Sequence, residues 1–289
     1  MSTMTTFSQR IHSRLDQLTK SERKIADYLQ RNFDEAVFFS AADLAEQLNL
    51  SEATVVRFAQ AIGFSGFPEL RQCLQELFKE KVTHAALLRK KLAELSPETH
   101  VLEQVMAMEM EYLTDAMRTV SREAFDEAVR VVCEARRLFV YGLSGSATLA
   151  ELLEHRLRRF GIEVVPLTQS GREVCEKLLM LTDEDAFLAI LFFNLSEVMV
   201  STLEYAKHCG CQVILLTDTL GPDLRDKVDV LLEARRGPVM AFHSLIVPMA
   251  IIQALIIAVA MADQKKALAT LDRLDDIRER LNFMATVKI

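Results

Sequence analysis

Apolar residues recur every three or four positions through the first 80 residues, which is the period of an α-helix. This pattern predicts a run of helices, three of which have Thr19, Ser40 and Ser51 as their N-caps. The last two meet at a tight turn around Asn49, and the final one ends at Gly63. Helix, short turn and helix is the arrangement of a helix-turn-helix motif, whose second helix enters the major groove of DNA.

The second predicted helix of this motif has one apolar and one polar face. Its inward positions are Val55, Phe58, Ala59 and Ile62. Thr54 and Arg57 then point outward beyond the cap Ser51, and Arg can bind guanine through two hydrogen bonds. Lys20 and Ser65 are placed to hold the DNA backbone. The alternative is a small helical protein-interaction domain whose polar face is only solvated.

Short apolar runs alternate with helical patterns between residues 137 and 232. This alternation predicts an α/β domain with a five-stranded parallel sheet flanked by helices, whose ligands bind at the carboxyl ends of the strands. The first strand ends at Ser144, Gly145 and Ser146, where hydroxyls and free amides at a helix start suit an anion. The nucleotide loop G-x-G-x-x-G is absent because positions 144 and 147 are Ser and Ala. An ordinary turn of small residues is the alternative.

The segment from Gly237 to Ala262 carries no charged residue and is long enough to cross a bilayer. Polar residues such as His243 and Gln253 interrupt it, and the chain has no second segment of this kind. These features favour a helix buried in the core and against a second subunit, rather than a membrane span. Because the N-terminus lacks a basic and then apolar secretion signal, we expect a cytoplasmic protein.

The net charge of −7 is not spread evenly along the chain. The first 91 residues hold 13 basic and 11 acidic residues, so the acidity belongs to the remainder. An acidic chain can therefore still carry a DNA-binding face, because phosphates respond to the local field. The five cysteines are odd in number and scattered, which argues against a disulfide framework. The cluster of His208, Cys209 and Cys211 lacks zinc-site spacing, and we expect neither a metal nor a cofactor.

Two stretches carry a resemblance to a known family. LTKSERKIADYLQRN and SAADLAEQLNLSEATVVRFAQAIGFSGFPELRQCL resemble the N-terminal domain of the RpiR family of bacterial transcriptional regulators, over about residues 7–80. In that family the domain binds operator DNA as part of a dimer or tetramer. The resemblance implies roles on the recognition helix for Ser51, Thr54 and Arg57.

Residues 122–262 resemble the SIS (sugar isomerase) domain, which follows the helix-turn-helix domain in such regulators and typically binds phosphorylated sugars. Its phosphate loop after the third strand commonly reads S-x-S-G-x-T. Here Leu191 and Phe193 replace the serines, Asn194 replaces the glycine, and Ser196 alone keeps a hydroxyl. Because a phosphate needs several donors, three interpretations follow. The domain binds a phosphosugar mainly through its first loop, or a less polar organic or acyl acid, or no ligand.

Together these patterns predict a helix-turn-helix domain at residues 1–80, a helical linker at 81–121 and a SIS-like domain for ligand binding and dimerisation at 122–289. We expect a homodimeric or homotetrameric transcriptional regulator that binds a palindrome-like operator and a small-molecule effector. The predicted effector contacts are Ser144, Ser146, Phe193, Asn194, Ser196 and His243.

Two other functions are compatible with the sequence. The first is a sugar-phosphate isomerase with an added helical domain, which needs a general base near the sugar. The candidates by position are Glu151, Glu154, His155, Glu197 and His243. The second is a dimeric DNA-binding scaffold that responds to no ligand.

Overall fold

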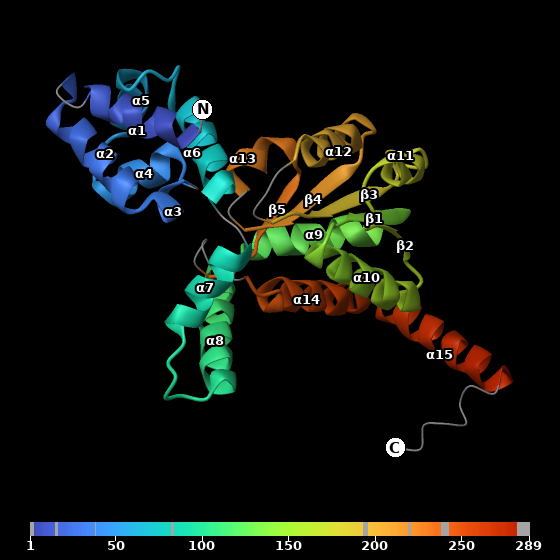
Figure 1. Ribbon diagram of the computed structural model, residues 1–289. Helices are drawn as coiled ribbons and strands as arrows, with labels where there is room; N and C mark the ends of the chain where they lie inside the picture. The colour runs from blue at the N-terminus through green and yellow to red at the C-terminus, as the bar shows by residue number, and fades with distance from the viewer. Residues whose placement is uncertain are drawn as a thin grey trace. The chain divides into compact units, whose positions relative to one another are not determined.

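The computed structural model describes residues 3–14, 17–37, 39–81, 84–192, 196–218, 221–237 and 243–281. The chain forms two compact units (Figure 1). One comprises Met1–Gln104 with Gly237–His243, and the other comprises Val105–Arg236 with Ser244–Ile289. The boundaries predicted near residues 80 and 121 remain predictions.

The regular secondary structure of the first unit is entirely helical within its described residues. Its helices are α1 (Thr3–Arg14), α2 (Lys20–Arg31), α3 (Phe33–Ala36), α4 (Ala41–Leu48), α5 (Glu52–Ala61), α6 (Phe67–Lys81), α7 (His84–Glu94) and the start of α8 (Val101–Thr119). The predicted caps are confirmed. Thr19 and Glu22 form a reciprocal capping box at the start of α2, and Ser40 and Asp43 form another at the start of α4.

The turn between α4 and α5 follows from its residues. Asn49 adopts a left-handed conformation with φ of 52°, which asparagine tolerates, and its backbone N–H caps the end of α4. Ser51 then caps α5 by accepting a hydrogen bond from the Thr54 backbone. The inward face of α5 is fully buried as predicted, at Val55, Phe58 and Ala59. Burying such a face against α2, α4 and α6 provides most of the stability of so short a helix.

The second unit is built on a five-stranded, all-parallel sheet with strand order β2-β1-β3-β4-β5, which confirms the predicted fold class. Its strands are β1 (Arg137–Tyr141), β2 (Glu163–Leu167), β3 (Ala186–Ile190), β4 (Gln212–Thr217) and β5 (Val230–Glu233). Its further helices are α9 (Arg122–Glu134), α10 (Gly145–Leu157), η2 (Arg158–Phe160), α11 (Arg172–Leu178), α12 (Glu197–His208), α13 (Gly221–Leu224), η3 (Arg225–Lys227), α14 (Ile246–Ala262) and α15 (Gln264–Arg280).

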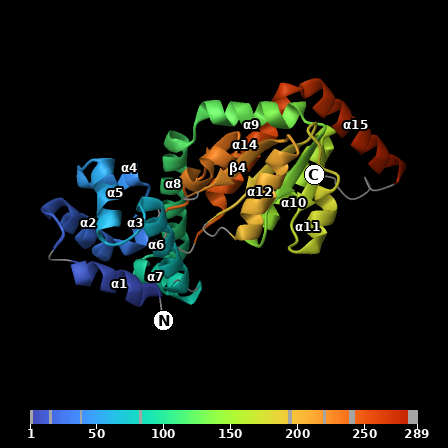
Figure 2. The same cartoon turned by 90° about the horizontal axis from the view of Figure 1, so that it is seen from above.

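Helices cover both faces of this sheet (Figures 1 and 2). Helices α9, α10 and α14 pack on one face, where they meet strand residues such as Val140 and Leu216. Helices α11, α12 and α13 pack on the other, against Phe139, Tyr141 and Leu215. Successive strand residues therefore enter two different cores, which explains why the strands read as continuous apolar runs.

The uncharged segment forms α14, and one of its faces lies in the core as predicted. Ile252 and Leu255 are each 1% exposed. The opposite face is exposed in the single chain, at Ile257 and Met261 for example. Among the described helices, none alone has the length and hydrophobicity to cross a membrane. Only as a pair, bent by 100° at their junction, do α14 and α15 have the length and composition of a membrane span.

Candidate functional site

The exposed face of α5 carries a row of hydrogen-bonded side chains. The Oγ atom of Ser51 lies 2.8 Å from the Oγ1 atom of Thr54, and the Nη2 atom of Arg57 donates to that same Oγ1 over 3.2 Å. The three predicted recognition residues therefore act as one group, with Arg57 at its exposed end. A guanidinium held in one orientation loses less freedom when it binds a base or a phosphate.

Two arginines of α1 hold the far end of α5. Arg10 donates from Nη1 to the carbonyl of Gly63, and Arg14 donates from Nη1 to the carbonyl of Ala61, each over 2.9 Å. The Arg10 guanidinium also lies 4.4 Å from the centre of the Phe64 ring. Cations at a helix C-terminus satisfy its last carbonyls and complement its dipole. Neither arginine was predicted from the sequence, because each is more than 45 positions away from its partner.

The two predicted contacts to the DNA backbone lie in different surroundings. Lys20 is exposed in the first turn of α2. Ser65 is also exposed, but its backbone N–H donates to Glu69 over 2.6 Å. The hydrogen bonds from the Ser65 backbone and hydroxyl lower the pKa of Glu69, so this carboxylate stays charged at neutral pH. An anion beside Ser65 opposes phosphate binding at that hydroxyl, so Lys20 is the better placed of the two.

In the sheet of the second unit, the direction in which successive strands are added reverses between β1 and β3. These strands are neighbours, yet α10, which follows β1, covers one face and α12, which follows β3, covers the other. The loops after the two strands therefore diverge, and ligands of such sheets bind in the crevice between them. The predicted effector loop after β1, at residues 142–146, and the described residues Leu191, Phe192 and Ser196 after β3 follow these two strands.

The loop after β1 is tightly wound. A Cβ atom at Gly142 would lie 2.7 Å from the carbonyl oxygen of Ser146, so only glycine fits there. Ser144 has φ of 54° and ψ of −124°, a conformation that residues with a side chain rarely adopt. Ser144 is exposed, Ser146 is 8% exposed, and neither hydroxyl bonds to a residue within the described ranges. Both hydroxyls can thus serve a ligand.

The loop after β3 begins with two apolar residues, Leu191 and Phe192. Leu191 is 2% exposed and packs in the core beneath α11 and α12. Phe192 is half-buried and packs against the opposite core, below α10 and α14. Phe193 and Asn194, both predicted contacts, lie outside the described residues. Ser196 caps α12 by accepting a hydrogen bond from the Met199 backbone, and its hydroxyl remains exposed.

A buried ion pair lies at the same edge of the sheet. Arg236, beyond β5, donates from Nε and Nη2 to the Oδ2 atom of Asp218, which follows β4, over 3.1 and 2.6 Å. Its guanidinium also lies 3.9 Å from the centre of the Phe192 ring. This ion pair was not predicted from the sequence, although both charged residues follow apolar strand runs, which was a usable signal. The remaining predicted contact, His243, is half-buried in the first unit.

The candidate bases for an isomerase are dispersed. Glu154 forms an ion pair with Arg158, and the Nε2 atom of His155 lies 2.8 Å from Nη2 of Arg159. Glu151 and Glu197 are exposed. Within the described ranges no three His, Cys, Asp or Glu side chains are grouped to hold a metal ion.

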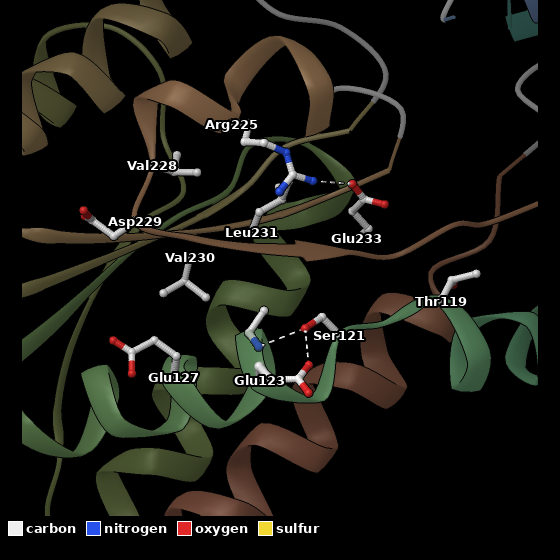
Figure 3. A pocket seen from close by; sticks show the side chains of 11 residues that line it. Thr119, Ser121, Glu123, Glu127, Arg225, Val228, Asp229, Val230, Leu231 and Glu233 are labelled. Carbon is white, nitrogen blue, oxygen red and sulfur yellow. Dashed lines mark hydrogen bonds and ion pairs between the residues drawn. The ribbon is translucent and has the colours of Figure 1, made fainter. Parts of the chain in front are cut away.

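A cavity of about 460 Å³ lies between α9 and the edge strand β5 (Figure 3). Its wall includes Glu123 and Glu127 of α9, and Asp229 and Glu233 from the β5 side. Arg225 pairs with Glu233 across 3.3 Å, as the dashed line shows. The cavity contains none of the predicted site residues, so its acidic wall is a separate surface.

Both units of the chain match known protein families. Residues 5–81 match the helix-turn-helix domain of the rpiR family, and residues 132–258 match the SIS domain. An uncharacterized HTH-type transcriptional regulator of Haemophilus influenzae is 27% identical over 224 residues, which are 77% of each chain. The HTH-type transcriptional regulator HexR of Pseudomonas aeruginosa is 28% identical over 216 residues, which are 74% of each chain.

Solved structures show the same fold. The sugar isomerase domain of an RpiR transcription factor from Sphaerobacter thermophilus matches with a TM-score of 0.58 and 26% identity, over 62% of this chain and 99% of that one. The Vibrio vulnificus NanR protein, solved in complex with ManNAc-6P, matches with a TM-score of 0.62 and 18% identity, over 94% of this chain and 98% of that one.

Proposed function

Because the chain belongs to the RpiR family of helix-turn-helix regulators and carries a SIS domain, we propose that it binds operator DNA through α5 and that an anionic metabolite at the β1–β3 crevice controls this binding. The observation that carries the DNA part is the hydrogen-bonded row of Ser51, Thr54 and Arg57. It lies on the one face of α5 that the core leaves exposed.

The chemistry of this row suits the major groove. The positive end of the α5 dipole lies beside Ser51, where backbone amides attract a phosphate. Arg57 lies in the second turn of the helix, at the depth where side chains of such motifs reach base edges. Lys20 supplies a further positive charge for the DNA backbone.

The effector is an anion of the sugar-phosphate or sugar-acid type. The strained turn at Ser144 presents two available hydroxyls at the start of α10, a setting that suits a phosphate or carboxylate. NanR, which has a similar fold, was solved with a phosphorylated sugar. The apolar residues after β3 replace the other half of a hydroxyl-rich site, so phosphate binding here depends mainly on the first loop.

A dimer formed along α14 accounts for the exposed apolar face of that helix. Ile246, Met249, Ile257 and Met261 are 40–74% exposed in the single chain. Such residues side by side are typical of an interface between subunits. A dimer with two-fold symmetry would present two copies of α5 to the two half-sites of a palindrome-like operator.

Electrophoretic mobility shift tests the proposal with the DNA upstream of the gene for this protein. We expect the wild-type protein to shift this fragment with a dissociation constant below about 1 µM at about 150 mM salt, and Arg57→Ala to raise this constant about tenfold or more. Sugar phosphates and sugar acids added at millimolar concentration should change the protein concentration at which half of the DNA is shifted. Turnover of sugar phosphates by the purified protein, with no shift of any fragment, would instead support the isomerase.

A further inference from the structure

We propose that Arg236 is the residue that recognises the effector, and that it does so by binding a carboxylate. This inference rests on the proposed effector site at the β1–β3 crevice and names the ligand group that distinguishes it. The ligand class is a sugar acid, with a phosphate or hydroxyls toward the loop after β1 and a carboxylate toward Arg236.

The guanidinium of Arg236 lies at the edge of the sheet where ligands bind. Arg236 follows β5, Asp218 follows β4 and Phe192 follows β3, so three strand ends converge on one charged group. Phe192 lies after the strand that neighbours β1, and adjacent strands are about 4.8 Å apart. A ligand that touches Ser144 or Ser146 would meet Arg236 by extending past the end of β3.

Arg236 is held in one orientation, but some of its N–H groups remain available to a ligand. Nε and Nη2 both donate to a single oxygen of Asp218, which occupies one edge of the guanidinium. The Phe192 ring covers one of its planes. The other fork, formed by Nη1 and the second N–H of Nη2, makes no hydrogen bond to any residue in the described ranges. A fork of two parallel N–H groups fits the two oxygens of a carboxylate.

Charge favours a carboxylate over a phosphate at this position. Asp218 already balances the positive charge of Arg236, so a dianionic phosphate would add strong repulsion to a nearly buried site. A carboxylate adds only one negative charge and matches the planar fork. The apolar neighbour Phe192 likewise favours a less charged group.

A purely structural role of the Arg236–Asp218 ion pair predicts a different result for two variants. If the pair only holds β4 against the chain beyond β5, then Arg236→Lys and Asp218→Asn both weaken the same interaction and reduce ligand binding alike. If Arg236 binds the carboxylate, the two variants act in opposite directions. Lysine loses the fork, whereas asparagine removes the competing negative charge and leaves the guanidinium with a stronger field.

The test is calorimetric titration of the full-length protein with 6-phosphogluconate and glucitol 6-phosphate. Both probes are open-chain phosphates that differ only in having a carboxylate or a hydroxymethyl group at C1. We expect the wild-type protein to bind 6-phosphogluconate at least about tenfold more tightly, the scale of one charge-assisted pair. Arg236→Lys should remove this preference, while Asp218→Asn should keep or increase it. Thermal melts confirm that each variant is folded.

The outcomes separate this inference from the proposed function. Equal affinity of the wild-type protein for the two probes would overturn the role of Arg236, even if both probes alter DNA binding. An equal loss of ligand affinity in Arg236→Lys and Asp218→Asn would also overturn this role. The ion pair would then serve only to hold the two strand ends together. A preference that depends on Arg236, without any effect of 6-phosphogluconate on DNA binding, would support the carboxylate site and contradict its regulatory role.

Discussion

Arg57 donates a hydrogen bond to Thr54 across one turn of α5, with 3.2 Å between Nη2 and Oγ1. Thr54 is in turn within 2.8 Å of Ser51, the N-cap of the same helix. A residue that caps the helix and a residue that reaches outward are thus connected through one hydroxyl. The orientation of Arg57 therefore depends on Thr54, which need not touch DNA itself.

The first prediction concerns this connection. Arg57→Ala should weaken operator binding by about 1–3 kcal/mol if Arg57 reads a base. Thr54→Val keeps the shape of the side chain, removes the hydroxyl, and should cost about 0.5–1.5 kcal/mol. Mobility-shift titrations at fixed salt measure both losses of affinity. Gln72→Ala, which changes an exposed residue of α6, is the matched control. Binding unchanged by Arg57→Ala would remove this residue from the interface.

The second prediction concerns the two faces of α14. Ile252→Glu places a charge where the side chain is 1% exposed, and it should unfold the second unit. Ile257→Glu alters a side chain that is 49% exposed in the single chain. It should leave the chain folded but dissociate the proposed dimer, as judged by light scattering and circular dichroism. A folded Ile257→Glu protein with the wild-type molar mass would place the subunit contact elsewhere.

The third prediction is a pH dependence of stability that comes from Asp185. Burial alone would raise the pKa of this carboxyl, but hydrogen bonds from Arg137, the Thr182 backbone and Arg136 outweigh it and lower the pKa from 3.8 to about 2. Because the folded-state pKa is lowered, ionised Asp185 stabilises the folded protein fully above about pH 4. This contribution to the free energy of unfolding is lost as the pH falls through 2. Its size is about 2 kcal/mol.

Urea unfolding between pH 2 and pH 5 measures this contribution. Asp185→Asn should lower the free energy of unfolding at pH 5 and flatten its decline toward pH 2, whereas Asp183→Asn, an exposed neighbour, should change neither. Parallel pH profiles for the wild-type protein and Asp185→Asn would show that the Arg137–Asp185 contact, 2.9 Å long, contributes little.

The fourth prediction concerns the thiols. Burial raises the pKa of Cys211 to about 12, and its Sγ atom donates to the carbonyl of Thr182 over 3.0 Å. Cys175 is exposed. A thiol reagent at pH 8 should therefore modify Cys175 rapidly and leave Cys211 intact, because the thiolate is the reactive form. Peptide mapping after partial labelling identifies each site, and all five cysteines should react in denaturant. Rapid labelling of Cys211 in the native protein would contradict its burial.

The sequence was sufficient for features that depend on neighbours along the chain. The capping pairs Thr19–Glu22 and Ser40–Asp43 lie three positions apart, and the inward face of α5 follows from one helical period. The alternation of strands and helices likewise predicted the parallel sheet. In each case the chemistry of a short segment decides its structure.

The contacts that the sequence could not reveal join residues far apart. Arg10 reaches Gly63 over 53 positions, and Arg236 reaches Asp218 over 18. Their pairing depends on how helices pack and on which strand ends meet. The order β2-β1-β3-β4-β5 and the register Thr217↔Glu233 bring β4 and β5 together, and only then does the pair at their carboxyl ends become visible.

The backbone of Ser144 has a consequence for attempts to stabilise this protein. A side chain at φ of 54° and ψ of −124° costs roughly 1–3 kcal/mol, which glycine would avoid. Selection for heat resistance alone should therefore enrich Ser144→Gly, which also discards a hydroxyl from the crevice. If the proposed effector binds at this loop, thermostable variants obtained in this way should respond to it poorly, so stability and effector response oppose each other at this one residue.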